Sequence, residues 1–142
     1  YDKINGYLVD IFNNVVIIEE ASLKNSKFND ISLKEMHTID VIGTHPDTTP
    51  SAVARELMLT LGTVTTSLNK LEKKGYIIRT RSSVDRRVVH LSLSKKGRLV
   101  YRLHRGFHKS MVMRITEGFN DEELKVMSKG LENLHAFLEE LK

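Results

Sequence analysis

A cluster of short polar side chains between Thr63 and Lys70 has residue types and a spacing that could form hydrogen bonds with nucleic acid. Val64, Leu68 and Leu71 recur at spacings of four and three, which predicts a helix with one apolar face. The opposite face then carries hydroxyl, amide and ammonium groups: Thr63, Thr65, Thr66, Ser67, Asn69 and Lys70. Such small polar side chains let a helix approach base edges and phosphates in the major groove of DNA. An ordinary solvated helix face is the alternative.

A second group of charged residues lies between two patterns typical of β-strands, residues 76–81 and 88–93. Asp85, Arg86 and Arg87 form the tip of the expected hairpin. An Asp at such a tip can hold one guanidinium and aim an arginine into a narrow minor groove, where the negative potential is greatest. We therefore expect Arg86 or Arg87 to enter the minor groove, held by Asp85. Phosphate contacts are expected from three other residues: Thr63, Arg79 and Arg81.

The distribution of charge supports a nucleic-acid partner. Residues 51–98 hold eleven Lys or Arg against three Asp or Glu, a net charge of +8. The remaining residues carry a net charge of −4, so the modest total of +4 hides a strongly basic segment. A concentration of positive charge of this kind is typical of phosphate binding. A scaffold protein that uses only helix pairing would leave this basic segment unexplained.

These polar and charged residues need a helix-turn-helix and a hairpin to position them. The pattern predicts helices over 51–58 and 63–74, a turn at 59–62, and a helix end at Gly75 after two lysines. Caps are expected at the two helix starts, from Thr49 before Pro50 and from Thr60. Helix, turn, helix and hairpin in this order predict a winged helix-turn-helix. We therefore expect a mainly α-helical fold with a small β-hairpin.

Apolar stripes at helical spacing flank this segment on both sides. Residues 3–26 carry one stripe: Ile4, Leu8, Ile11, Val15 and Ile18. Residues 32–43 begin with a capping-box pattern, and a long helix is expected over 95–116. The last helix, which follows Asn120, carries another stripe: Leu124, Met127, Leu131, Leu134, Leu138 and Leu141. Stripes of this regularity need a partner surface, either in the same domain or in a second chain.

The expected long helix carries a row of cations on one face. Five residues recur at spacings of three and four: Lys95, Arg98, Arg102, Arg105 and Lys109. A solvated face is the ordinary explanation for such a row. Five aligned cations could also dock an acidic protein, because they steer a negative surface toward the helix.

The composition excludes several classes of function. The chain of 142 residues is of ordinary single-domain size, and it has no cysteine for disulfides, thiolate catalysis or redox sensing. It has no apolar run of 18 residues and no signal-peptide pattern, so we expect a cytoplasmic protein. Because residue 1 is Tyr, we expect a short preceding segment. Phosphate-binding glycine loops and nucleophile elbows are absent, and we do not expect an enzyme.

Three motifs in the sequence resemble the multiple-antibiotic-resistance regulator (MarR) family. They are the Asp85-Arg86-Arg87 tip, the helix end over residues 71–77, and residues 91–97, in which Ser94 replaces the usual Thr. The resemblance covers nearly the whole chain. It implies one domain over residues 1–142, with a winged helix-turn-helix at 31–94 and helical dimerisation regions at 1–30 and 95–142. Regulators of this family pair through their terminal helices, so we expect a C2 dimer that places two recognition helices about 34 Å apart on palindromic DNA.

Residues 28–39 and 59–68 are similar to the branch of the family that represses fatty-acid synthesis genes. That resemblance implies that long-chain acylated acyl carrier protein is the corepressor. The cation row would hold the acidic carrier, and the acyl chain would enter an apolar tunnel. The candidate lining residues are Ile17, Met36, Ile39, Val100, Leu103 and Phe107.

A zinc-responsive repressor is the alternative function. His104 and His108 are four residues apart and could bind one ion from one helix face. The other candidate ligands are His37, Glu19 and Glu20. Zinc-sensing members of the family use similar positions. If acylated acyl carrier protein is the corepressor, no permanent cofactor is expected. His45 and His90 are expected to be exposed or structural.

Overall fold

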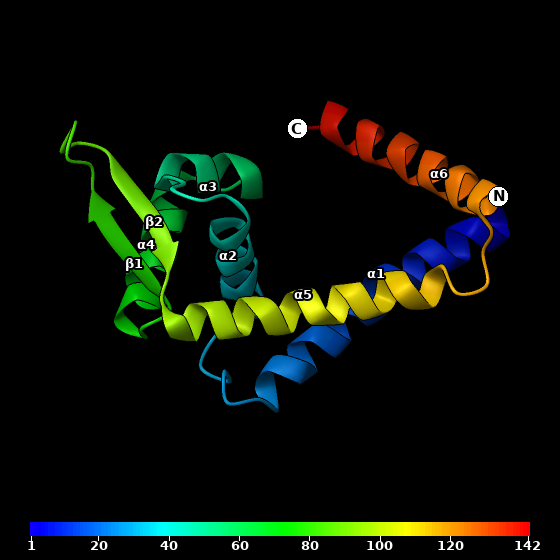
Figure 1. Cartoon of the computed structure of the whole chain (residues 1–142), viewed down its shortest axis with the longest axis horizontal. Coiled ribbons are helices and arrows are strands. Elements are labelled where there is room, and N and C mark those ends of the chain that lie inside the picture. The colour runs from blue at the N-terminus through cyan, green and yellow to red at the C-terminus, as the bar shows by residue number, and fades with distance from the viewer. The chain divides into compact units, whose positions relative to one another are not determined.

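The computed structural model describes all 142 residues (Figure 1). The chain forms two compact units, Tyr1–Arg102 and Leu103–Lys142. The first unit holds α1 (Asp2–Lys24), α2 (Leu33–Thr44), α3 (Pro50–Leu57), α4 (Leu61–Lys73), β1 (Ile77–Arg81), β2 (Val89–Leu93) and the start of α5 (Lys95–Ile115). The second unit holds the rest of α5 and α6 (Asp121–Glu140). The expected mainly α-helical fold with one hairpin is confirmed.

The core of the first unit lies where α2, α3, α4 and the hairpin meet. Its largest fully buried side chains are Tyr76, Met36, Ile39, Leu68, Leu71, Leu91, Val53, Val64 and Val100. The predicted apolar face of the recognition helix, with Val64, Leu68 and Leu71, is therefore the buried face. Its polar residues are left on the opposite face, because a helix that buries one stripe exposes the other.

Local capping explains where the helix-turn-helix begins and turns. Thr49 Oγ1 accepts a hydrogen bond from the Ala52 N–H, with Pro50 in the first turn of α3. Met58 has φ +54°, and this left-handed residue ends α3. Thr60 Oγ1 caps α4 by accepting from the Thr63 N–H at 3.2 Å. The helix therefore begins at Leu61, two residues before the predicted start at 63, because the first turn follows directly on its cap.

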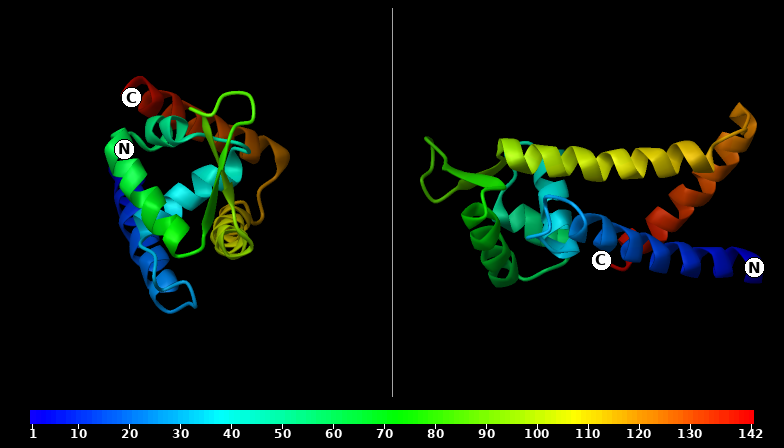
Figure 2. Two further views of the ribbon diagram at one scale, coloured as in Figure 1. Left: turned by 90° about the vertical axis from the view of Figure 1, so that its left-hand side faces the viewer. Right: turned by 90° about the horizontal axis from the view of Figure 1, so that it is seen from below.

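The hairpin is a two-stranded antiparallel sheet that follows directly on α4. Gly75 has φ +85°, a conformation that glycine adopts without strain, and it turns the chain from α4 into β1. The register pairs Ile77 with Leu93 and Arg81 with Val89. Both views in Figure 2 show the loop between the strands extending away from the helices of this unit. The hairpin is therefore a wing with an exposed tip.

The start of α5 packs closely on the core of the first unit. Ser94 Oγ caps the helix by accepting from the Gly97 N–H at 3.1 Å, as the sequence predicted. A Cβ atom at Gly97 would lie 2.1 Å from the backbone oxygen of Tyr76. Only glycine therefore allows this approach of α5 to the chain that enters β1.

A polar network at the end of α4 ties it to the segment before α2. The buried Tyr76 hydroxyl donates to Asp30 Oδ1, and burial together with this bond raises the pKa of Tyr76. Lys96 Nζ lies 3.8 Å from Asp30 Oδ2 and 4.3 Å from the Tyr76 ring centroid. Lys74 Nζ lies 3.2 Å from Glu35 Oε2. These contacts fix the end of the recognition helix against α2 and α5.

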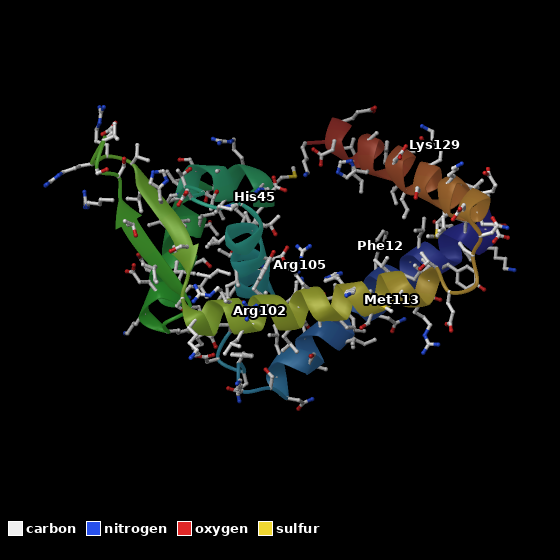
Figure 3. The ribbon with its side chains drawn as sticks, in the orientation of Figure 1. Phe12, His45, Arg102, Arg105, Met113 and Lys129 are labelled. Atoms are coloured by element: carbon white, nitrogen blue, oxygen red, sulfur yellow. The ribbon has the colours of Figure 1, made fainter.

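The second unit is a helical pair with exposed apolar side chains. Asn120 and Glu123 form a capping box at the start of α6. No residue of α6 is buried, and its exposed large apolar residues are Val126, Leu131, Phe137 and Leu138. Figure 3 labels Met113 of α5, which is exposed too. None of the helices combines the length and hydropathy needed to cross a membrane.

Candidate nucleic-acid interface

The exposed face of α4 presents threonine oxygens as hydrogen-bond acceptors. Thr65 Oγ1 donates its proton to the Leu61 carbonyl at 2.8 Å, and Thr66 Oγ1 donates to the Gly62 carbonyl at 3.1 Å. Both side chains are exposed. Because each hydroxyl proton is held by the helix backbone, the oxygen lone pairs remain available to a partner. The face predicted from the sequence is therefore present, with a defined hydrogen-bond polarity at these two positions.

Asn69 and Arg79 are joined by a hydrogen bond that sequence reasoning missed. Arg79 Nη2 donates to Asn69 Oδ1 at 2.7 Å, and Arg79 Nε lies 3.9 Å from Glu72 Oε2. The guanidinium of β1 is thus directed at two residues one helical turn apart on α4. The i, i+3 spacing places Asn69 and Glu72 on one face of α4, but the packing of β1 against α4 was needed to place Arg79 beside them.

The wing tip holds Arg87 in a fixed orientation. Arg87 Nε donates to Asp85 Oδ1 at 3.1 Å, and Arg87 Nη2 donates to Asp85 Oδ2 at 3.1 Å. The Arg87 side chain is nevertheless 90% exposed. Arg81 Nη1 donates to the Arg86 carbonyl at 3.2 Å, which braces the same loop. The structure therefore pairs Asp85 with Arg87, which the sequence had left open between Arg86 and Arg87.

The ion pair at the tip lowers the pKa of Asp85, because the Arg87 side chain and backbone N–H both bind the charged carboxylate. Because the pKa is lower in the folded state than in the unfolded state, the ion pair stabilises the fold at pH values above the ordinary aspartate pKa. This stabilisation is lost as the pH falls through the lowered pKa. We expect an NMR titration of the Asp85 carboxyl to show a midpoint below that of an ordinary aspartate. In Arg87→Ala the midpoint should return to the ordinary range, and an unchanged midpoint would contradict the pairing.

The helix face and the wing share one surface. A hollow is lined by Thr65 of α4, Arg87 of the wing and the start of α3. Its other lining residues are Thr49, Pro50, Ser51, Leu61, Val88 and Val89. Hydroxyl acceptors and a guanidinium therefore lie side by side, where one polyanionic partner can contact both. Lys70 and Thr63 are also exposed on α4, and Ser67 is half-buried.

The predicted cation row lies along α5. Lys95, Arg102, Arg105 and Lys109 are exposed, and Figure 3 labels Arg102 and Arg105. Arg98 is exposed too, but its Nη1 donates to the Leu93 carbonyl at 3.0 Å. Arg98 therefore has a structural contact at the start of the helix.

The candidate acyl-chain residues lie in different environments. Met36, Ile39 and Val100 are fully buried in the core of the first unit. Ile17 and Leu103 are exposed, and Phe107 is half-buried. The tunnel itself stays a prediction.

The histidines proposed as metal ligands are partly brought together. The ring centroids of His104 and His108 lie 4.4 Å apart on α5. His37 and Glu20 are exposed, and Glu19 is buried. His90 Nδ1 lies 2.9 Å from the Asp47 carbonyl oxygen, in keeping with a structural role. The zinc set stays a prediction.

Comparisons with known proteins agree with this arrangement. The sequence profile of the MarR family matches residues 31–89. Over 100% of this chain and 99% of the other, the structure is similar to FabT of Streptococcus pneumoniae, solved in complex with DNA, at 66% identity and a TM-score of 0.91. The chain belongs to the MarR family. Its resemblance to FabT places it in the same branch.

Two further relatives show how far this MarR-family resemblance extends. PchR of Bacillus subtilis (strain 168), an HTH-type transcriptional regulator, is 31% identical over 111 residues. That alignment covers 76% of this chain and 66% of PchR, so the chain spans about two thirds of that relative's length. MepR of S. aureus, solved with DNA, shares the fold at a TM-score of 0.72 and 21% identity, over 93% of this chain and 94% of that one.

Proposed function

We propose that this MarR-family regulator is a cytoplasmic repressor that binds a palindromic operator as a homodimer. The observation that carries the proposal is the shared surface on which Thr65 of the recognition helix lies beside the oriented, exposed Arg87 of the wing. The α4 face would enter the major groove, and Arg87 would enter the adjacent minor groove. The similar FabT was solved in complex with DNA, which supports DNA binding by this chain.

The dimer is supported by apolar side chains that the monomer leaves in solvent. Ile4, Ile11, Phe12 and Ile18 of α1 are exposed, and Figure 3 labels Phe12 on this helix. In the second unit, α6 also exposes large apolar residues. Because burial of apolar area stabilises association, a second copy of the chain would bury them.

The direct test is an equilibrium titration of duplex DNA at several salt concentrations. The proposal predicts tight binding to promoter DNA of fatty-acid synthesis genes. The logarithm of the association constant should fall linearly with the logarithm of salt, with a slope of roughly −0.9 for each phosphate contacted. Binding that is weak and insensitive to salt would contradict a basic interface. Sedimentation at micromolar concentration should show a dimer.

We further propose that long-chain acylated acyl carrier protein is the corepressor. The resemblance of residues 28–39 and 59–68 to the branch of the family that represses fatty-acid synthesis genes supports a function in fatty-acid gene control. Exposed cations at Lys95, Arg102, Arg105 and Lys109 match the charge of a small acidic protein. The acyl chain would then lie among the predicted lining residues Ile17, Met36, Ile39, Val100, Leu103 and Phe107.

Charge reversal in the cation row of α5 can test the docking proposal while leaving Arg98 unchanged. Because Arg98 also binds the Leu93 carbonyl, the better variant is Arg102→Glu with Lys109→Glu. We expect this double variant to lose the enhancement of DNA binding by acylated carrier protein, while affinity for DNA alone stays within about twofold. Lys129→Glu on α6, outside the row, is the matched control and should keep the enhancement. Full enhancement in the double variant would remove the row from the mechanism.

The close approach of the His104 and His108 rings, whose centroids lie 4.4 Å apart, supports zinc control as the second candidate function. Metal analysis of the purified protein, with DNA titrations in chelator and in added zinc, distinguishes control by zinc from control by acylated carrier protein. A repressor controlled by acylated carrier protein should show no response to zinc. A change in DNA affinity with zinc that His104→Ala removes would favour the second candidate.

A further inference from the structure

We propose that Arg79 is a positioning residue that fixes the side-chain amide of Asn69, so that Asn69 reads guanine rather than adenine. The inference rests on the proposed function, since it concerns how α4 meets the major groove. It assigns to Arg79 a part in sequence selection in place of the phosphate contact expected from the sequence.

The contact geometry fixes the guanidinium on α4. Arg79 Nη2 lies 2.7 Å from Asn69 Oδ1, and its Nε lies 3.9 Å from Glu72 Oε2. The Arg79 side chain is 27% exposed, against 90% for the wing arginine Arg87. A charge-assisted bond to an amide oxygen is short and directional, so it holds the Asn69 side chain in one rotamer. The negative charge of the Glu72 carboxylate offsets part of the positive charge of Arg79, which weakens the attraction of Arg79 for a phosphate.

The chemistry of the two groups determines which way the amide faces. A guanidinium has only donors, so the atom of Asn69 that faces Arg79 must be the oxygen. The amide nitrogen, with its two hydrogens, is then directed away from Arg79. Asn69 is exposed on the same face of α4 as Thr65 and Thr66. Toward a partner it therefore presents donors.

Fixed donors favour one base over the others. Asparagine recognises adenine by using its oxygen and its nitrogen together, on N6 and N7. With the oxygen held by Arg79, that paired contact is lost, and the adenine amino group would face the donors of Asn69. Guanine presents O6 and N7, which are both acceptors in the major groove. The same helix offers acceptors at Thr65 and Thr66, which suit the amino groups of cytosine or adenine.

The experiment is in vitro selection from a duplex library, followed by titrations of single-base variants. The wild-type protein selects from DNA randomised over roughly 20 base pairs, which spans two half-sites one helical turn apart. Each guanine in the selected half-site is then exchanged for adenine. We expect one position at which the wild type prefers guanine by roughly 5- to 30-fold, and at which Arg79→Met reduces the preference below about twofold. Arg79→Lys, which keeps a donor, should restore part of it.

Arg81→Met is the matched control on the same strand, because the Arg81 guanidinium donates to the Arg86 carbonyl of the wing, whereas that of Arg79 donates to Asn69 of α4. It should lower affinity equally for both bases. The salt dependence further separates a phosphate contact from a positioning contact. Loss of a phosphate contact reduces the magnitude of the slope of log association constant against log salt concentration by about 1, whereas loss of a positioning contact leaves that slope unchanged. Arg79→Met should keep the wild-type slope.

Asn69→Asp gives an independent reading, since it keeps the acceptor for Arg79 and removes the outward donors. Asn69→Asp should abolish the guanine preference, and this result does not depend on whether Arg79→Met folds stably. The inference is overturned if Arg79→Met weakens binding to all duplexes equally with a shallower salt slope, or if Asn69→Asp keeps the preference for guanine. If the wild type enriches no sequence at all, the proposed function itself fails.

Discussion

Alanine at Arg87 is expected to weaken operator binding by roughly 1–3 kcal/mol for each wing, because it removes the guanidinium aimed at the minor groove. Two observations make this the largest expected effect on binding. The side chain is 90% exposed, so a partner can reach it, and two bonds to Asp85 hold it in place before binding. A preorganised arginine loses less conformational entropy on binding than a free one. Fluorescence anisotropy with the selected duplex measures the change.

Arg86→Ala is the control for Arg87→Ala. Arg86 carries the same charge as Arg87, but the hydrogen bonds to Asp85 are made by Arg87. Arg86→Ala should cost less than Arg87→Ala. Asp85→Asn should fall between the two, since it leaves the guanidinium in place but removes its charged partner. Equal losses from Arg86→Ala and Arg87→Ala would show that the wing contributes charge alone.

Alanine at Gly97 is expected to lower the free energy of unfolding by about 3 kcal/mol. The added Cβ would lie 2.1 Å from the Tyr76 oxygen and 3.3 Å from the Leu93 Cβ, so α5 must move away from the core. The first of these atoms belongs to the backbone and cannot rotate aside. Urea unfolding followed by circular dichroism gives the change, at a protein concentration held equal for both proteins.

Gly106→Ala on the same helix is the matched control. No atom lies within 4 Å of a Cβ built there, so the substitution should add up to about 1 kcal/mol through helix propensity. If Gly97→Ala were as stable as Gly106→Ala, the close approach of α5 to Tyr76 would be wrong.

Local patterns predicted most of the secondary structure because their causes lie within a few residues. The capping box at Ser32 and Glu35 and the threonine cap of α4 have the predicted hydrogen bonds. The contacts that hold these elements together were not predictable in the same way. Asp30, Tyr76 and Lys96 meet from segments far apart in the chain, and no spacing in the sequence brings them together.

The candidate site shows the same division. Charge and spacing identified the polar face of α4 and the Asp-Arg-Arg tip, and the structure places Thr65 and Arg87 on one surface. A phosphate contact is expected from Arg79 because an arginine in a basic segment is typical of one. Its hydrogen bond to Asn69 depends on the packing of β1 against α4, which residue type does not reveal. A side-chain direction of this kind follows from packing between elements and not from residue type.

Hydroxyl-radical footprinting of the selected duplex tests the winged dimer on DNA most directly. The account predicts two protected stretches on each strand, centred about 10 base pairs apart, with protection of the flanking minor groove that disappears in Arg87→Ala. A single protected stretch, or flanking protection that survives the loss of Arg87, would contradict it.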